Sequence, residues 1–239
     1  MSLPRRTPVD LELVIPAYNE ALRLPRTLEA AVDFLARAPW SSRIVVVDNG
    51  STDDTAGVAR RLAPTGLVEV IGCARPGKGA AVRCGVLTSS ATWVGYADAD
   101  LSTPVSTLPA AIAHLENGAA AAIASRHVTG ASLALAQRPL RRVGGAVFRA
   151  LTWRLLPGIH DTQCGFKVFR REAVQRALLQ CRESGFAFDV ELLLRIRAAG
   201  GEIVEVPVRW TDDRASRLNP VSDGLNAFHS VLTMRRVWR

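Results

Sequence analysis

Long apolar runs, paired cysteines and lysine are all scarce in this chain of 239 residues. A membrane-spanning helix needs about 20 consecutive, mostly apolar residues. The best candidate, residues 119–124, is far shorter than that. We therefore expect a chain that does not cross a membrane, although contact with a membrane surface stays open.

The cysteines offer no evident disulfide framework. Only four are present, Cys73, Cys84, Cys164 and Cys181, and no C-x-x-C pair occurs among them. No apolar segment typical of a signal peptide precedes them. This pattern predicts reduced thiols that pack inside a cytoplasmic protein.

Lysine is nearly absent, yet the chain is basic. Lys78 and Lys167 are its two lysines, arginine supplies the other basic residues, and the formal net charge is +8. A basic surface favours partners that carry phosphate, such as nucleotides or anionic lipid headgroups. Nucleic acid is disfavoured, because the chain has no recognised binding motif and no interleaving of aromatic and basic residues.

The first half of the chain alternates between short apolar strands and helices. A hydrophobic content of 48%, with no linker and no internal repeat, fits one folded domain. We expect strands at 11–15, 43–47, 68–71 and 93–97, followed by helices at 25–36, 51–62, 78–89 and from Thr103-Pro104 to just before Gly118. This order predicts an α/β fold with a mostly parallel sheet flanked by helices.

The second half is less regular and completes the same domain. It contains a basic amphipathic helix at 140–156 and a strand with alternating side chains at 202–209. The other elements that we expect are strands at 120–125 and 165–170 and helices at 189–199 and 222–237.

Two carboxylates follow the strand at 93–97. Asp98 and Asp100 are one residue apart, and in an extended backbone residues i and i+2 point to the same side. Hard oxygen ligands at a strand end suit Mg²⁺ or Mn²⁺, usually shared with substrate phosphates. The alternative is a solvated loop with two turn-forming aspartates.

Other polar residues also follow predicted strands, and in parallel sheets ligands bind beyond the carboxyl ends of the strands. We therefore treat these residues as one candidate site: Tyr18, Asn19, Glu20, Asp48, Lys78, Asp98 and Asp100. Lys78 lies between two glycines just before a helix, where an ammonium and backbone N–H groups can bind phosphate. The chain lacks both the G-x-x-x-x-G-K-[ST] loop and a G-x-G-x-x-G turn after the first strand, which disfavours an ATPase and a dinucleotide-dependent oxidoreductase.

Several motifs resemble those of glycosyltransferase family two. They are VIPAYNE at 14–20, VDNGSTD at 47–53 and DAD at 98–100. Within the family, the chain is similar to the dolichyl-phosphate glucosyltransferase branch. The segments that carry this similarity are RPGKGAAVR at 75–83, DTQCGFK at 161–167 and FAFDVEL at 186–192.

The resemblance implies a GT-A fold, a nucleotide-diphosphate sugar donor, a divalent metal and inversion at the anomeric carbon. It also implies a nucleotide-binding half at 11–118, an acceptor half at 119–212 and a C-terminal helical extension at 213–239. In this resemblance the nucleoside would be lined by Pro16, Ala17, Tyr18 and Glu20, and Asp48 would contact the base or ribose. The metal and diphosphate would be held by Asp98, Ala99 and Asp100. Arg126 would lie near the diphosphate or the acceptor phosphate. Asn49 departs from the pattern, because many members carry a second Asp there. The branch similarity favours a uridine donor over a guanosine donor.

The acceptor decides which residues are catalytic. A polyprenyl phosphate is largely dianionic at neutral pH, because its second pKa is about 6, and needs no strong general base. A hydroxyl acceptor on a natural product or glycan would need one, and Asp189 and Glu191 are the candidates, with Asp161 behind them. Positions i and i+2 of a helix diverge, so we expect only one of the first two to face the acceptor.

A lipid acceptor would require the protein to dock on the cytoplasmic face of a membrane. Two basic amphipathic segments, 140–156 and 225–239, could provide that contact. In this hypothesis Arg141 or Arg142 would meet the acceptor phosphate. The alternative is that the first segment is a core helix with a solvated arginine face.

Overall fold

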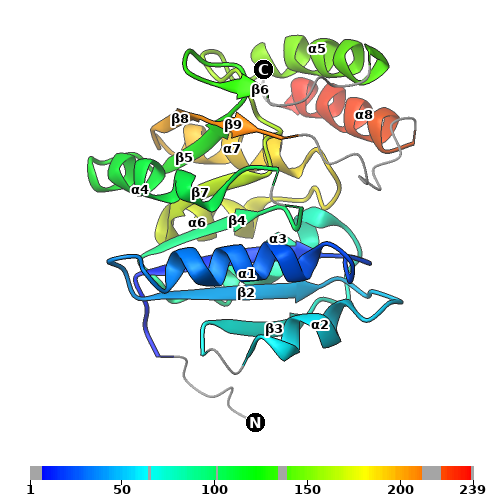
Figure 1. Ribbon diagram of the computed structural model, residues 1–239. Helices are drawn as coiled ribbons and strands as arrows, with labels where there is room; N and C mark the ends of the chain where they lie inside the picture. The colour runs from blue at the N-terminus through cyan, green and yellow to red at the C-terminus, as the bar shows by residue number, and fades with distance from the viewer. Residues whose placement is uncertain (1–6, 64–65, 101, 134–138, 212–221, 238–239) are drawn as a thin grey trace.

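Seven strands form one twisted sheet in the order β3-β2-β1-β4-β7-β5-β8 (Figure 1). The computed structural model describes residues 7–63, 66–100, 102–133, 139–211 and 222–237. The strands of the sheet are β1 Leu11–Ala17, β2 Ser42–Asp48, β3 Val68–Gly72, β4 Trp93–Ala97, β5 Ala121–Ser125, β7 Phe166–Arg170 and β8 Ile203–Pro207. A separate two-stranded sheet pairs β6 Ser132–Leu133 with β9 Arg209–Trp210.

Helices cover both faces of the main sheet (Figure 1). The helices are α1 Leu24–Leu35, α2 Thr55–Arg61, α3 Lys78–Leu87, α4 Leu108–Glu116, α5 Pro139–Trp153, α6 Arg171–Gln180, α7 Phe188–Ala198 and α8 Ser222–Val237. One hydrophobic cluster joins the sheet to α1, α2 and α4, and a second joins it to α3, α6 and α7 and reaches α5 and α8. The α/β fold class expected from the sequence is confirmed.

The central strands are apolar because both of their faces are covered. Along β1, Leu13 and Ile15 face the cluster under α1, whereas Val14 faces the cluster under α3. All three are fully buried. Strands of a parallel sheet with helices on both sides read as continuous hydrophobic runs for this reason.

Strand β7 runs antiparallel between β4 and β5, while β1, β2, β3 and β4 pair in parallel. Its amino end therefore lies at the edge where β4 and β5 have their carboxyl ends. The backbone N–H of Asp98 donates to the carbonyl of Gly165 at 2.8 Å across this edge. Loop 161–165, which leads into β7, consequently lies beside the predicted metal ligands.

Some element predictions are wrong. Helix α6 has no counterpart among the predicted elements, and the predicted strand at 202–209 is split into β8 and β9. The helix expected from Thr103-Pro104 begins at Leu108, after a short 3₁₀ turn, and Pro109 occupies its first turn. The helix expected at 51–62 begins at Thr55, and the Asp54 side chain before it provides no cap.

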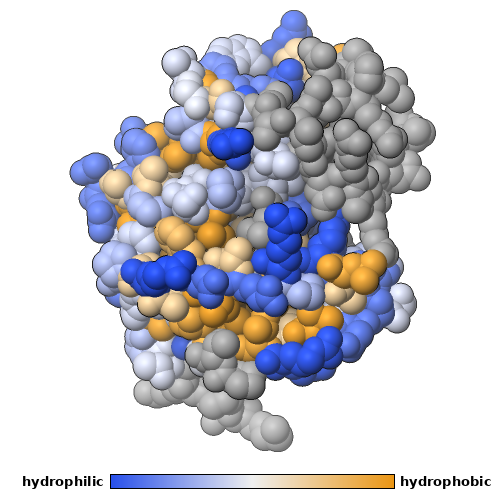
Figure 2. Space-filling model, in the orientation of Figure 1, coloured by the Kyte–Doolittle hydropathy of each residue, from blue (hydrophilic) through white to orange (hydrophobic). Residues whose placement is uncertain are grey.

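Helices α5 and α8 lie side by side at the end of the molecule away from β3 (Figure 1). The rings of Phe148 and Phe228 pack edge to face with centroids 5.5 Å apart. In the space-filling view, hydrophobic residues gather mostly across the lower half of the visible face (Figure 2). No helix in the described part of the chain is long and apolar enough to cross a membrane. The side chains of Arg141 and Arg142 lie outside the described residues.

Candidate active site at the carboxyl edge of the sheet

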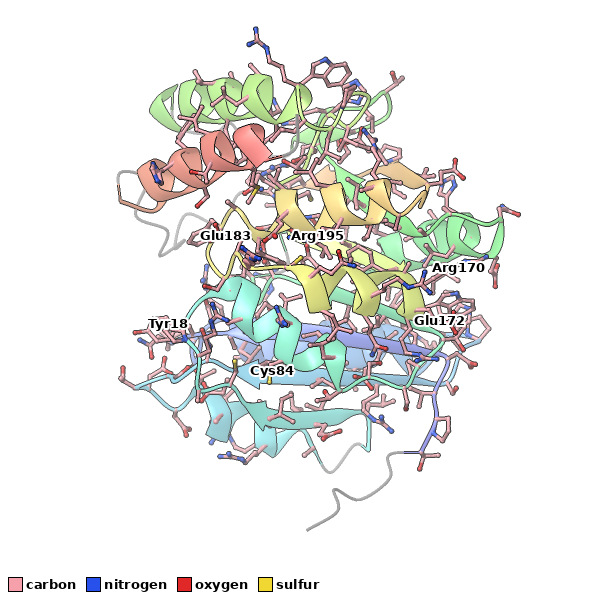
Figure 3. All side chains as sticks on the ribbon, turned by 180° about the vertical axis from the view of Figure 1, so that it is seen from behind. Tyr18, Cys84, Arg170, Glu172, Glu183 and Arg195 are labelled. Carbon is pink, nitrogen blue, oxygen red and sulfur yellow. The ribbon has the colours of Figure 1, made fainter. Side chains whose placement is uncertain are left out.

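The predicted site residues gather at the edge where β1, β2 and β4 end. Ala17, Asp48 and Ala97 are the last residues of these three strands. Figure 3 shows Tyr18 and Arg170, the last residue of β7, on opposite sides of the molecule. Pro16 and Ala17 still belong to β1, and the Tyr18 side chain that follows is 56% exposed.

Asn19 joins the loop after β1 to the turn after β2. Its φ of 56° is left-handed, a conformation that asparagine tolerates better than most residues. Its Oδ1 accepts the backbone N–H of Thr52 at 2.8 Å, and its own N–H donates to Ser51 Oγ at 2.9 Å. The backbone N–H of Glu20 donates to Thr55 Oγ1 at 2.8 Å. The two segments that resemble nucleoside-binding motifs are thus held together as one unit.

Asn49 fixes the loop that carries Lys78. Its Nδ2 donates to the carbonyls of Cys73 and Arg75, at 3.2 and 2.7 Å, and its Oδ1 accepts the N–H of Gly77 at 2.8 Å. A carboxylate could accept the last bond but could not donate the other two. The amide therefore has a structural reason to stand where many family members carry Asp.

Lys78 and Asp98 form an ion pair at the centre of the site, with Nζ 2.6 Å from Oδ1. Burial opposes the charge of the ammonium, but the carboxylates of Asp98, Asp189 and Asp100 outweigh this effect and raise the pKa of Lys78. Lys78 is the first residue of α3, so its ammonium and the helix amino end offer positive charge at the same place. An anion such as a diphosphate can be bound there.

Asp100 lies beside Asp98 in surroundings that disfavour a second negative charge. Burial, and then the charge of Asp98, raise the pKa of the Asp100 carboxyl. Its Oδ1 accepts the N–H of Ser102 at 2.9 Å, and the carbonyl of Ala99 between the two aspartates accepts Thr27 Oγ1 at 2.7 Å. A divalent cation would relieve the repulsion between two such carboxylates. The pair therefore fits a Mg²⁺ or Mn²⁺ whose other ligands come from a substrate.

Asp189 is buried below these residues and is already paired. Its Oδ1 is 2.6 Å from Lys167 Nζ and also accepts the hydroxyl of Tyr96. Asp189 is 2% exposed and Lys167 is fully buried. Lys167 Nζ also donates to the carbonyl of Cys164 at 2.7 Å. Asp189 thus holds an internal ammonium that in turn holds loop 161–165.

Glu191 points in a different direction from Asp189, as helical spacing predicts. Its Oε2 accepts the backbone N–H groups of Arg182 and Glu183, at 2.9 and 2.7 Å. Its Oε1 is 2.5 Å from Arg195 Nη2. Both oxygens are therefore engaged in holding the segment before α7, which leaves little reason to place Glu191 among the reacting groups.

Arg126 is held rigidly at the end of β5. Its Nε and Nη2 donate to the two carboxylate oxygens of Asp161, at 2.7 and 2.9 Å, and its guanidinium lies 5.2 Å from the Trp210 ring centroid. Burial opposes the charge of Asp161, but Arg126 outweighs it and lowers the pKa of that carboxyl. The result is a preorganised cation just after β5, held in a fixed orientation.

The family follows from comparison with known proteins. Residues 12–178 match the model of Glycosyl transferase family 2. The chain belongs to this family. It is a glycosyltransferase, as the sequence motifs indicated.

Relatives of this family 2 glycosyltransferase include named enzymes. It is 35% identical to the human dolichyl-phosphate beta-glucosyltransferase over 95% of this chain and 75% of that protein. It is 31% identical to the Dictyostelium discoideum protein of the same name, over 96% of this chain and 76% of that one. An uncharacterized glycosyltransferase of Mycobacterium tuberculosis is 35% identical over 95% of both chains.

Solved structures support the GT-A fold of this family 2 glycosyltransferase. Glucosyl-3-phosphoglycerate synthase from Mycobacterium tuberculosis, in complex with Mn²⁺, uridine diphosphate and phosphoglyceric acid, superposes with a TM-score of 0.71. It is 21% identical, over 94% of this chain and 78% of that one. At this identity the likeness concerns the fold.

Three residues of this candidate site were not assigned a role from the sequence. Lys167, Asn49 and Gly165 act through contacts between segments far apart in the chain. A Cβ at Gly165 would overlap the Asp98 carboxylate. The resemblance to the 161–167 segment marked Lys167 and Gly165 as part of a motif, but only the antiparallel placement of β7 explains why they lie beside Asp98.

Proposed function

We propose that the protein transfers a hexose, with inversion, from a uridine-diphosphate sugar to a polyprenyl phosphate. The observation that carries this proposal is the convergence of Asp98, Asp100 and Lys78 beside the clamped Arg126. This arrangement offers one centre for a diphosphate and a second cation for another phosphate. The names of the dolichyl-phosphate beta-glucosyltransferases support the acceptor. Structural neighbours in complex with uridine diphosphate and Mn²⁺ support the donor and the metal.

At the donor end, the residues that bind and those that position are distinct. Pro16, Ala17, Tyr18 and Glu20 would line the nucleoside, with Asp48 at the base or ribose and Ala99 at the diphosphate. Asp98 and Asp100 would hold a Mg²⁺ or Mn²⁺, which neutralises charge on a departing diphosphate when bound. Lys78 would turn from Asp98 to a phosphate oxygen. Asn49 and Gly77 keep the loop in place while it does so.

At the acceptor end, no residue has to remove a proton. A phosphate dianion is already a nucleophile, so Arg126 needs only to bind and orient it. A hydroxyl acceptor would require a general base with a free oxygen near the reacting atom. Asp189 is buried with Lys167 and Tyr96, and both oxygens of Glu191 are engaged. This occupancy favours a phosphate acceptor over a hydroxyl acceptor.

A donor-by-acceptor screen tests the proposal. Radiolabelled UDP-glucose, UDP-galactose and GDP-mannose are each incubated with polyprenyl phosphate or with soluble hydroxyl acceptors, with and without Mn²⁺. We expect label in the organic phase only with a uridine donor, polyprenyl phosphate and the metal. Label that stays on a water-soluble acceptor would instead support a hydroxyl acceptor with Asp189 as the base.

A lipid acceptor also implies contact with a membrane surface, and we propose that α5 and α8 provide it. Val147 on α5 and Leu232 on α8 are exposed apolar side chains, whereas Val231 is buried in the core. The measurement is co-sedimentation with vesicles of anionic lipid at low salt, where the protein is expected in the pellet. Protein that remains in the supernatant, together with unchanged lipid transfer by the Arg141→Ala/Arg142→Ala variant, would contradict docking.

A further inference from the structure

Two neighbouring side chains in the loop before β7 have buried polar atoms without a hydrogen-bond partner in the part of the chain that the structure describes. They are Thr162 Oγ1 and Gln163 Nε2. Thr162 is 2% exposed. Unpaired buried polar atoms are rare in native proteins, and leaving one unpaired costs free energy. Two of them on consecutive residues call for a specific explanation.

The loop itself is firmly anchored, so these atoms are not the product of loose packing. Asp161 accepts two bonds from the Arg126 guanidinium, the Cys164 carbonyl accepts Lys167 Nζ at 2.7 Å, and the Gly165 carbonyl accepts the Asp98 N–H at 2.8 Å. Asp161, Cys164 and Gly165 are therefore each tied to a charged side chain or to β4, and the backbone N–H of Gln163 donates to Asp161 Oδ1 at 3.3 Å. Within the described residues, the Thr162 hydroxyl and the Gln163 amide nitrogen are left without a partner on this anchored backbone.

Their position lies between the two ends of the proposed reaction. The loop joins Asp98, at the diphosphate end, to Arg126, at the acceptor end. Phosphates at either end are matched by the cations Lys78 and Arg126, whereas Thr162 and Gln163 offer neutral groups. A hydroxyl donates and accepts, and an amide nitrogen donates. This chemistry suits a neutral, hydroxyl-rich group rather than another anion.

We propose that Thr162 Oγ1 and Gln163 Nε2 hydrogen-bond hydroxyl groups of the transferred hexose and so select the sugar. This inference rests on the proposed nucleotide-sugar donor, but not on the identity of the acceptor. The unused hydrogen bonds of the free protein are made when the sugar is bound. Lys167 and Asp189 then serve as positioning residues, because they hold the backbone from which the two side chains project.

Calorimetric titration with UDP-glucose and with UDP separates the sugar from the nucleotide. Thr162→Val keeps the shape and removes the hydroxyl, and Gln163→Met removes the amide. Each is expected to weaken UDP-glucose binding about tenfold, the effect of losing one hydrogen bond, and to leave UDP binding unchanged. Thr162→Ser should restore the affinity. Equal losses for UDP and UDP-glucose, or no loss for either, would overturn the inference, as would a parent protein that binds UDP-glucose no more tightly than UDP.

Thermal unfolding of the same variants gives a second readout. Because the Thr162 hydroxyl is unpaired in the free protein, Thr162→Val is expected to raise the melting temperature. The matched control is Thr152→Val on α5, where the buried hydroxyl donates to the Arg149 carbonyl at 3.1 Å and its loss should lower the melting temperature. A fall for Thr162→Val as large as that for Thr152→Val would contradict the inference. Neither the calorimetric titration nor the thermal unfolding contains an acceptor. Both therefore still test the role of Thr162 and Gln163 in sugar binding if the protein proves not to transfer to polyprenyl phosphate.

Discussion

The charged residues of the site are partners of one another. Lys78 pairs with Asp98, and Lys167 pairs with Asp189. Both lysines of this arginine-rich chain are therefore used here. A lysine ammonium is a compact charge on a flexible stem, whereas a guanidinium is a wide, planar fork. The narrow buried position beside Asp189 and the Cys164 carbonyl suits the compact group.

The Lys167–Asp189 pair is expected to behave as one unit. Lys167→Met leaves the buried Asp189 carboxylate without its ammonium, and Asp189→Asn leaves the buried Lys167 ammonium without its carboxylate. Each substitution should therefore lower the free energy of unfolding by about 3–5 kcal/mol. The double variant should lose much less than the sum of the two. Urea denaturation of the four proteins measures this coupling.

The same variants test whether Asp189 is a general base. We expect Asp189→Asn to act through stability and to leave the shape of the pH–rate profile unchanged. A variant that unfolds like the parent, loses about 10²- to 10⁴-fold in rate and loses the acidic limb of the profile would identify Asp189 as the base.

Asp100 should make stability depend on pH in a defined direction. Its pKa is raised in the folded protein, so the folded state binds the proton more tightly than the unfolded chain does. The stability from this proton is fully present below the ordinary value of 3.8 and is lost as pH rises through the raised value. Asp100→Asn should therefore be more stable than the parent near neutral pH, with no such advantage in acid. Chemical denaturation across pH tests this, and a variant less stable than the parent at neutral pH would contradict it.

At the level of elements, the site depends on where loops cross the sheet edge. The order of strands and helices in residues 11–118 could be predicted because apolar runs and turn residues alternate regularly there. The antiparallel entry of β7 between β4 and β5 could not, because strand order depends on packing rather than on local pattern. For the same reason, the contacts of Asp98 with Gly165 and of Lys167 with Asp189 could not be predicted from the sequence.

Gly165 allows loop 161–165 to approach Asp98, and this close contact can be tested. A Cβ at Gly165 would overlap the Asp98 carboxylate, so Gly165→Ala should displace a proposed metal ligand and reduce transfer by about tenfold or more. The control is Gly144→Ala in α5, where a Cβ meets nothing within 4 Å and alanine should stabilise the helix by about 1 kcal/mol. Steady-state kinetics and melting temperatures are compared. Normal activity in Gly165→Ala would show that the loop adjusts freely.

At the scale of the whole molecule, the two hydrophobic clusters pack against a sheet whose carboxyl edge carries the candidate site. Strand ends from opposite halves of the chain meet there, with Asp98 after β4 and Arg126 after β5. The proposed reaction uses both halves at once, because the donor diphosphate and the acceptor phosphate must come close together. This requirement makes the chemical nature of the product the best indicator of the function.

The most direct measurement is ³¹P NMR of the lipid product formed from UDP-glucose, polyprenyl phosphate and Mg²⁺, a diamagnetic ion that leaves the phosphorus signals sharp. We expect the phosphomonoester signal of the lipid to be replaced by the signal of a phosphodiester that carries glucose. We also expect Asp98→Asn, or removal of the metal by a chelator, to lower the rate of this change by at least about a hundredfold. A lipid phosphomonoester that stays unchanged while glucose becomes attached to a hydroxyl group, or full activity in chelator, would contradict these expectations.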